Sequence, residues 1–163
     1  MFKTHEPAAP GTQVATSDLI AALKFDANGL IPAVAQQHDT REILMMAWMN
    51  RDALQETLKT RRVCYFSRSR GKLWRKGESS GQIQKLHALY ADCDGDTLVV
   101  EVDQTGPACH TGRSSCFYWR IDETTAEITS APLIDPATLY GRADGASSPK
   151  DQSADAADSI PTS

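Results

Sequence analysis

Apolar residues along the first two thirds of the chain occur in short runs, and polar segments rich in glycine separate these runs. Runs of about four to eight residues that alternate, or are apolar throughout, are typical of β-strands. Asp94-Gly95 is a tight-turn signal, so the runs on either side of it are predicted to form a hairpin. In all, the pattern predicts strands over residues 30–35, 44–49, 63–68, 82–92, 97–103 and 116–121.

Two segments show helical signals instead. Asn50 is a favourable N-cap for a helix over residues 51–60, in which one face carries Ala53, Leu54, Thr57 and Leu58. Ser17 is the corresponding cap for a shorter helix over residues 18–24. The expected fold class is therefore α+β: β-rich, with mainly antiparallel strands and two short helices.

Two groups of side chains are expected in the core. Residues 44–49 contain three methionines and Trp48, whose simplest role is packing. Cys64, flanked by Val63 and Tyr65, is expected to be a small buried hydrophobic residue. The other three cysteines lie farther along the chain and need a separate explanation.

The 163 residues are enough for one domain with a substantial core. Residues 1–16 lack periodicity and are expected to be a flexible arm, and residues 17–121 form the predicted domain. Residues 122–140 are a C-terminal extension with apolar residues that could dock as a small clasp: Leu133, Ile134, Leu139 and Tyr140. Residues 141–163 have a composition that cannot bury a core, so we expect a disordered tail.

The sequence also favours one compartment. No apolar run reaches the roughly 20 residues of a membrane span, and residues 1–10 lack the apolar segment of a secretory signal. We therefore expect a cytoplasmic protein. In a reducing compartment, four cysteines favour metal binding, catalysis or packing over disulfides.

Basic residues are concentrated in one segment of an acidic chain. The net charge is −4, yet residues 59–85 hold nine lysines and arginines and a single acidic residue. This favours a discrete anionic ligand, because nucleic-acid modules tend to be basic overall. Within the segment, residues 69–81 combine bases with glycines and serines that suit phosphate oxygens. A solvated loop is the alternative, and Trp74, which can stack on a base, favours the ligand.

Cys93, Cys109 and Cys116 do not have the paired spacing of structural zinc ribbons or fingers. Three thiolates would leave one zinc position for water, as catalytic sites do. His110 is either a fourth ligand or a proton carrier beside that water. We favour the second role, because adjacent residues rarely ligate one ion together. The alternative is that all three cysteines are simply packed or exposed.

Three aspartates surround Cys93. Along an extended chain Asp92 and Asp94 project to one side and Cys93 to the other, so carboxylates and thiolate need not share an ion. With Asp96, these carboxylates suit magnesium, which binds oxygen ligands and substrate phosphates. A solvated acidic turn is the alternative.

Three motifs occur in a fixed order: Leu73-Trp74-Arg75-Lys76-Gly77-Glu78-Ser79-Ser80-Gly81, then Asp92-Cys93-Asp94-Gly95-Asp96, then Gly106-Pro107-Ala108-Cys109-His110-Thr111-Gly112 with Ser115-Cys116-Phe117. Together they resemble the phosphoribosyl-AMP cyclohydrolases of histidine biosynthesis, over residues 30–120. The resemblance implies a metal-dependent hydrolase that opens the adenine ring of phosphoribosyl-AMP at the N1–C6 bond.

The resemblance also implies a homodimer that shares its zinc sites. Cys93 of one subunit would meet Cys109 and Cys116 of the other, and magnesium would bind Asp92, Asp94 and Asp96. His110 is the candidate catalytic residue, delivering a proton to N1. The candidates for substrate binding are Arg68, Trp74, Arg75, Lys76, Glu78 and Ser80.

Two other functions fit parts of the sequence. A non-catalytic zinc-stabilised module could bind RNA or another polyanion through the basic segment, but the acidic overall charge and the lack of an obvious fourth zinc ligand weigh against it. A deaminase of free nucleotides would need His-x-Glu and Pro-Cys-x-x-Cys patterns, which the sequence lacks.

Overall fold

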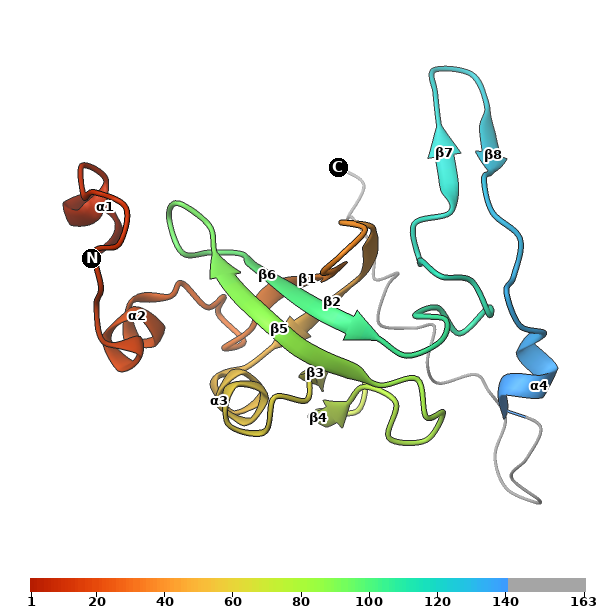
Figure 1. Ribbon diagram of the computed structural model, residues 1–163, viewed down its shortest axis with the longest axis horizontal. Coiled ribbons are helices and arrows are strands. Elements are labelled where there is room, and N and C mark those ends of the chain that lie inside the picture. Colours follow the sequence, from red (N-terminus) through yellow and green to blue (C-terminus); the bar gives the residue numbers. More distant parts are fainter. Residues whose placement is uncertain (141–163) are drawn as a thin grey trace.

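The computed structural model describes residues 1–140, which form a six-stranded sheet, a separate two-stranded sheet and short helices at their margins (Figure 1). The helices are α1 (Phe2–His5), α2 (Thr16–Ala22), α3 (Arg51–Thr60) and α4 (Pro136–Tyr140). The strands are β1 (Ile31–Gln37), β2 (Ile43–Met49), β3 (Cys64–Ser67), β4 (Lys72–Arg75), β5 (Gln84–Ala91), β6 (Leu98–Gln104), β7 (Trp119–Ile121) and β8 (Ala126–Ile128). The predicted α+β, β-rich class is confirmed. The expected disordered tail, residues 141–163, lies outside the described residues.

The large sheet has the order β4-β3-β2-β1-β6-β5. β1 to β4 pair with their neighbours in antiparallel fashion, and so do β5 and β6, which form the predicted hairpin. Among the described strands the one parallel pair is β1 with β6, which joins the four-stranded part of the sheet to the β5–β6 hairpin. Of the helices described in residues 1–140, none is both long enough and apolar enough to cross a bilayer.

The core lies along the central strands and under α3. Alternate residues of β6 are fully buried, namely Leu98, Val100 and Val102, as the sequence alternation predicted. α3 covers the sheet with Ala53, Leu54 and Thr57, the face expected from its pattern. Burial of these side chains is the main source of the fold's stability.

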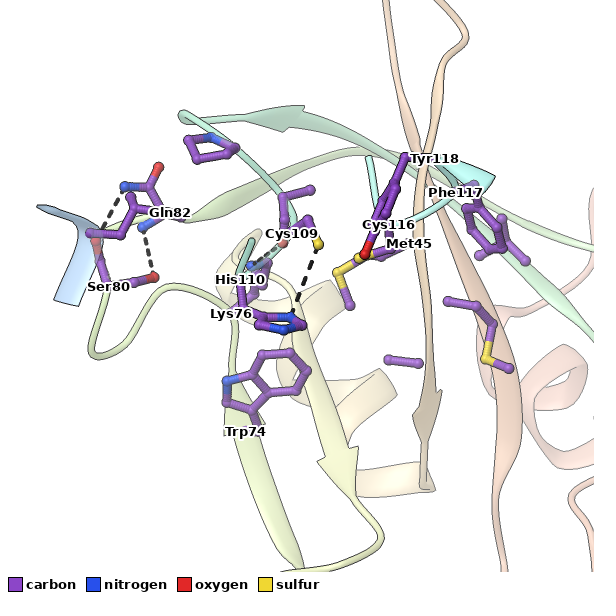
Figure 2. A pocket seen from close by; sticks show the side chains of 16 residues that line it. Met45, Trp74, Lys76, Ser80, Gln82, Cys109, His110, Cys116, Phe117 and Tyr118 are labelled. Atoms are coloured by element: carbon purple, nitrogen blue, oxygen red, sulfur yellow. Dashed lines mark hydrogen bonds between the residues drawn. The ribbon is translucent and has the colours of Figure 1, made fainter. Parts of the chain in front are cut away.

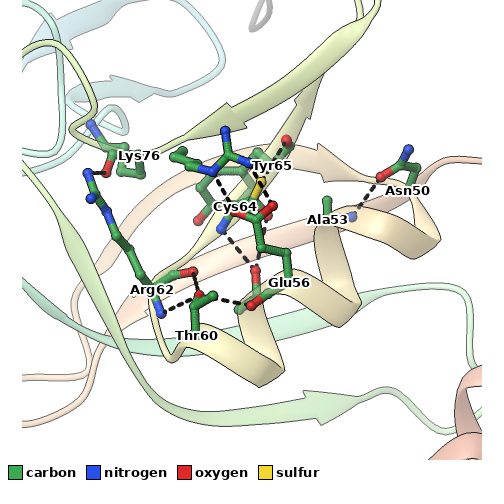
Figure 3. Close-up of polar contacts among 10 residues, drawn as sticks. Asn50, Ala53, Glu56, Thr60, Arg62, Cys64, Tyr65 and Lys76 are labelled. Atoms are coloured by element: carbon green, nitrogen blue, oxygen red, sulfur yellow. Dashed lines mark hydrogen bonds and ion pairs between the residues drawn. The ribbon is translucent and has the colours of Figure 1, made fainter.

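The bounds of α3 match the prediction because its cap is local. The Asn50 side chain accepts a hydrogen bond of 2.8 Å from the Ala53 N–H (Figure 3). α2 begins two residues earlier than expected, with Ala15 at its N-cap position, so the predicted Ser17 cap is wrong. Ser17 lies inside the first turn, and its hydroxyl donates to Asp18 instead.

Some elements were not predicted. β4 lies within residues 69–81, for which the sequence analysis predicted no strand, and pairs with β3 so that Trp74 lies opposite Tyr65. β4 is an edge strand of only four residues with a basic residue at each end, so it lacks the apolar alternation of a longer half-buried strand. The segment 116–121 forms a strand only from Trp119, in a pair with the unpredicted β8. α1 and α4 are single turns without a strong sequence signal.

The core assignments are correct with one clear exception. Cys64 and Met49 are fully buried, and Met45 is nearly so. Met46, also expected in the core, is 39% exposed, because it alternates with Met45 along β2 and projects from the other face of that strand. Trp48 is only partly buried.

Candidate functional site

A cavity of about 530 Å³ opens between β2, the end of β4 and the loop 105–118 (Figure 2). Six of the predicted site residues line it: Trp74, Lys76, Ser80, Cys109, His110 and Cys116. Much of the remaining wall is apolar, from Val34, Met45, Met46, Ala47, Pro107, Ala108, Phe117, Tyr118 and Leu139. A mostly apolar cavity with a few polar groups is the usual form of a small-molecule site.

Hydrogen bonds to main-chain carbonyls fix the loop that carries the two cysteines. The N–H of Cys116 donates to the Leu44 carbonyl at 2.7 Å, and the Ser115 hydroxyl donates to the Ile43 carbonyl at 2.6 Å. The N–H of Cys109 donates to the Arg113 carbonyl at 3.1 Å within the loop. These bonds tie the loop to the first half of β2.

The thiols of Cys109 and Cys116 lie together on the cavity wall, close enough for each to change the pKa of the other. Interaction with Cys116 lowers the pKa of Cys109 to about 5, although burial opposes the shift, and the Thr111 hydroxyl, 3.1 Å from the Cys109 sulfur, adds to it. The same thiol pairing, together with burial, raises the pKa of Cys116. Two sulfurs in this contact, one of them readily deprotonated, fit the donor set of a zinc ion.

His110 lines the cavity beside this pair. Its Nδ1 lies 4.0 Å from the Cys109 sulfur, and the residue is exposed. An imidazole that reaches the cavity from the residue next to a candidate metal ligand can receive and deliver a proton there.

Cys93 lies away from the other two cysteines. It is exposed at the tip of the β5–β6 hairpin, whereas Cys109 follows the other end of β6. At about 3.3 Å per residue, β6 separates these positions by roughly 20 Å. Within residues 1–140 the side chains of three or more possible metal ligands converge at one place, and that group contains aspartates alone. One subunit therefore does not bring the three cysteines together.

The converging group is Asp92, Asp94 and Asp96, whose nearest carboxylate oxygens lie within 4.8 Å of one another. Asp92 Oδ1 accepts hydrogen bonds from the N–H groups of Gly95, at 2.8 Å, Asp96, at 2.9 Å, and Thr97, at 3.3 Å. Burial acts to raise the pKa of Asp92, but bonds from the Thr97 and Asp96 N–H groups outweigh it, so that the pKa is lowered.

The other two carboxylates of this acidic tip, Asp94 and Asp96, each have a partner on one oxygen as well. Asp94 Oδ2 lies 2.8 Å from Lys24 Nζ, and Asp96 Oδ1 accepts a 3.0 Å bond from the Thr97 hydroxyl. In the described part of the chain these bonds engage one oxygen of each carboxylate, so the second oxygens fit the oxygen-ligand chemistry of magnesium.

The N-terminal segment contacts the acidic tip, which the sequence did not indicate. The N–H of Lys24 donates to the Gly95 carbonyl at 2.7 Å, in addition to its side-chain ion pair with Asp94. The ring of Phe2, in the predicted arm, lies against Gly95. Phe2, Lys24 and Gly95 are far apart in sequence, so no local sequence signal predicts that they meet.

Two neighbouring residues predicted to bind substrate, Arg75 at the end of β4 and Lys76 just after it, point in opposite directions. Arg75 points toward α3, where its guanidinium makes two bonds to the Glu56 carboxylate, of 2.6 and 2.8 Å. Lys76 projects the other way into the cavity wall and is only 7% exposed. Its Nζ donates to the Ala108 carbonyl at 2.9 Å. Burial lowers the pKa of Lys76, while the sulfurs of Cys116 and Cys109 oppose that shift.

Arg68 and Glu78 do not line the cavity of the single subunit. The Arg68 guanidinium lies 5.0 Å from the centre of the Trp48 ring, and Glu78 is exposed at the turn after β4. Ser80 does line the cavity, and its hydroxyl accepts the Gln82 N–H at 3.3 Å. Gln82 was not predicted and lines the cavity as well.

The C-terminal extension also contributes to the cavity. The N–H groups of Leu133 and Ile134 donate to the Gly112 carbonyl at 2.8 and 3.3 Å, and Leu139 of α4 lines the cavity. Gly112 has a positive φ of 78°, and a Cβ there would overlap the Ile134 carbonyl. The extension thus docks mainly through its backbone, because the Leu133 side chain remains exposed.

Comparison with known proteins gives a consistent result. Residues 45–118 match the family model described as phosphoribosyl-AMP cyclohydrolase. The chain is 65% identical to the phosphoribosyl-AMP cyclohydrolase of Alkalilimnicola ehrlichii over 87% of this chain and 100% of that protein. It is 65% identical to that of Chromohalobacter salexigens, over 86% of this chain and 96% of the relative, and 63% identical to that of Rhodospirillum rubrum, over 82% and 94%.

Proposed function

The chain belongs to the phosphoribosyl-AMP cyclohydrolase family, and on that premise we propose that it hydrolyses phosphoribosyl-AMP in histidine biosynthesis. Water adds at C6 of the adenine ring and the N1–C6 bond breaks. The exocyclic amine is kept as a carboxamide, and N1 keeps its ribose phosphate. The product is the phosphoribosylformimino aminoimidazole carboxamide ribotide.

The observation that carries this proposal is the Cys109–Cys116 thiol pair on the wall of a ligand-sized cavity. We propose that these two sulfurs hold zinc together with Cys93 of the second subunit in a homodimer. A zinc ion held there would supply a water of lowered pKa, which is a nucleophile at neutral pH. Cys93 is exposed at the tip of a hairpin far from the cavity of its own subunit. This supports the proposal that the Cys93 of one subunit reaches the cavity of the other.

The residues of the chain orient the substrate and move the proton. Trp74 offers its ring to the adenine base at the cavity wall. His110 takes the proton from the attacking water and delivers it to N1 as the ring opens. Ser80 contacts the substrate from the same wall. The side chains of Arg75 and Lys76 already bond to Glu56 and Ala108, so we assign neither of them to a phosphate.

Magnesium has a separate place in this proposal. Asp92, Asp94 and Asp96 would hold it at the exposed tip, with substrate phosphates as further ligands. The tip carries Cys93 as well, so a subunit that donates Cys93 to its partner's zinc brings the acidic tip beside the same cavity. Arg68 and Glu78, which lie outside the cavity of one subunit, would meet the substrate from its rim.

An exposed apolar surface supports the homodimer. β7 and β8 stand apart from the large sheet (Figure 1) and every residue in them is exposed. Their apolar side chains include Trp119, at 54%, and Ile121, at 78%. An isolated two-stranded hairpin is marginal in water, and exposed apolar patches of this kind commonly mark interfaces. A second copy of the chain would cover this surface.

The test is an ultraviolet assay for opening of the purine ring of phosphoribosyl-AMP. Protein stripped of metal is assayed alone and after addition of zinc, magnesium or both. We expect turnover to require zinc and to rise further with magnesium. Full activity of metal-free protein would refute the proposed mechanism, and zinc binding without any turnover would favour a non-catalytic zinc module.

A further inference from the structure

We propose that Lys76 is a positioning residue for the zinc site, one that fixes the Cys109 segment through the Ala108 carbonyl and offsets the charge of the zinc-bound thiolates. The inference rests on the zinc site proposed above, and it gives Lys76 a role other than phosphate binding. It concerns the surroundings of the ligands and not the ligands themselves.

The first argument is the burial of Lys76. Lysines are almost never buried unless they are paired, because the ammonium loses its hydration. Lys76 is nevertheless 7% exposed, and its Nζ is held 2.9 Å from the carbonyl of Ala108, the residue before Cys109. The Ala108 carbonyl takes one of the three N–H donors of the ammonium, and the Trp74 ring lies 5.8 Å from Nζ, but neither group carries a negative charge. A burial this costly points to an anion nearby.

The second argument is the way in which the backbone fixes Lys76. Its N–H donates to the Val63 carbonyl at 3.1 Å, and its carbonyl accepts a bond of 3.5 Å from the Arg62 guanidinium (Figure 3). The next residue, Gly77, has a φ of +77°, and a Cβ there would overlap the backbone of Gln82 and Ile83. The close approach of residues 82–83, just before β5, therefore requires glycine at position 77, and it holds Lys76 in the wall rather than in solvent.

The third argument is charge. Three thiolates and one zinc ion carry a net charge of −1, which is costly on a mostly apolar wall. Lys76 lines the same cavity as Cys109 and Cys116 (Figure 2), so its ammonium lies where it can offset this charge. Groups around metal ligands commonly change metal affinity by about 10- to 100-fold.

The test compares three substitutions that separate the hydrogen bond from the charge. Lys76→Arg keeps both, Lys76→Gln keeps a donor without the charge, and Lys76→Met loses both. Lys59→Met is the matched control, because Lys59 is exposed on α3. Zinc affinity is measured by competition with a chelator, and the thiolate-to-metal absorption band is recorded on cobalt-loaded protein. Thermal unfolding of the metal-free proteins reports folding.

We expect Lys76→Gln and Lys76→Met to lower zinc affinity by about 10-fold or more and to shift the cobalt band. Lys76→Arg should stay within a few-fold of the unaltered protein, and Lys59→Met should match it. The metal-free variants should still fold, and Lys76→Met should lose only the contribution of the Lys76–Ala108 bond, because the net charge of the zinc–thiolate centre is then absent. If Lys76 had only a structural role, its substitution would destabilise the metal-free protein and leave zinc affinity and the cobalt band unchanged.

Several outcomes would overturn the proposal. Unchanged zinc affinity and cobalt spectrum in folded Lys76→Met would do so, and so would full affinity in Lys76→Gln, which would leave no role for the charge. Failure of both neutral variants to fold would make Lys76 structural. If the unaltered protein binds neither zinc nor cobalt at its cysteines, the proposed function itself fails, which is a distinguishable result.

Discussion

The cavity and the acidic tip lie at opposite ends of β6 and are built in different ways. At the tip, Asp92 bonds to N–H groups three to five residues away, and the three carboxylates are exposed. In the cavity, Ser115 bonds to Ile43, 72 residues away in sequence, and Lys76 bonds to Ala108, 32 residues away. The tip is thus held mainly by local contacts and the cavity by contacts between distant segments.

This difference matches the chemistry proposed for each end. Zinc in a catalytic site needs sulfurs fixed in tetrahedral geometry with one open position. A loop held by hydrogen bonds to a distant strand supplies that rigidity. Magnesium keeps several waters and uses few protein ligands, which suits exposed carboxylates. We therefore expect the cavity to retain its ion firmly and the tip to exchange its ion with solvent.

The largest effect should come from mixing two inactive variants. Cys93→Ala and Cys109→Ala should each lose more activity than the roughly 10- to 100-fold that loss of an outer partner costs, because each removes a zinc ligand. If the subunits share their sites, co-refolding equal amounts restores about one quarter of the activity, since half of the dimers are mixed and each has one intact site. The measurement is ring-opening activity before and after mixing.

The control for this experiment is a mixture of Cys109→Ala with Cys116→Ala. Both of these cysteines belong to the same half of the proposed zinc site, so the mixed dimer has no intact site. Recovery in this control, or none in the first mixture, would contradict the shared site.

The next effect concerns the C-terminal extension on the cavity side. Gly112→Ala should destabilise the protein by about 2–4 kcal/mol, because a Cβ meets the Ile134 carbonyl in addition to the strain of positive φ. Gly29→Ala is the control, since Gly29 has a similar φ of +73° with nothing within 4 Å of its Cβ. It should cost only the strain, about 1 kcal/mol. Chemical denaturation measures both, and equal losses would show that the docked extension adds no constraint.

At the tip, Asp92→Ala should lower stability by about 1 kcal/mol at neutral pH, because it removes the acceptor of three N–H bonds. Asp94→Ala, which removes a surface ion pair, should change stability much less. The pKa of Asp92 is lowered from its ordinary 3.8, so its contribution is complete above that value. It is lost as the pH falls through the lower pKa of the folded protein.

Denaturation at several pH values checks this prediction. The stability difference between the unaltered protein and Asp92→Ala should be constant above pH 5 or so and should shrink below pH 4. A difference that grows on acidification would mean that the carboxylate is not the stabilising form.

The smallest effect should be at Lys24, whose ammonium competes with a cation for Asp94. Lys24→Met should raise magnesium affinity at the tip about two- to fivefold, as befits an exposed ion pair. Lys59→Met removes the same charge elsewhere and should leave that affinity unchanged. Calorimetric titration of the metal-stripped variants with magnesium measures the affinity of each. Weaker magnesium binding at the tip of Lys24→Met would instead mean that Lys24 holds the carboxylates in their binding arrangement.

The same contrast explains what the sequence could predict. The Asn50 cap, the hairpin turn at Asp94-Gly95 and the alternation of β6 are local signals, and the structure confirms them. The acidic cluster is equally local, because its members are neighbours in the chain. Sequence reasoning works where the partners of a residue lie within a few positions of it.

The remaining features depend on distant segments. The opposite directions of Arg75 and Lys76 follow only once β4 is known to be a strand, and its basic composition hides that. The contact of Lys24 with Asp94 spans 70 residues, and the docking of Leu139 at the cavity depends on an extension with little pattern. The meeting of Cys109 with Cys116 depends on bonds from their loop to β2.

The parallel pairing of β1 with β6 affects how the chain reaches its native state. β1 to β4 and the β5–β6 hairpin are each assembled from sequence neighbours, whereas Ala33 must find Leu98 across most of the domain. Such long-range docking is slow because a large loop has to close first. During synthesis on the ribosome, the edge of β1 that pairs with β6 will therefore stay unpaired until β6 has been made. In that interval the nascent chain is most exposed to misassembly.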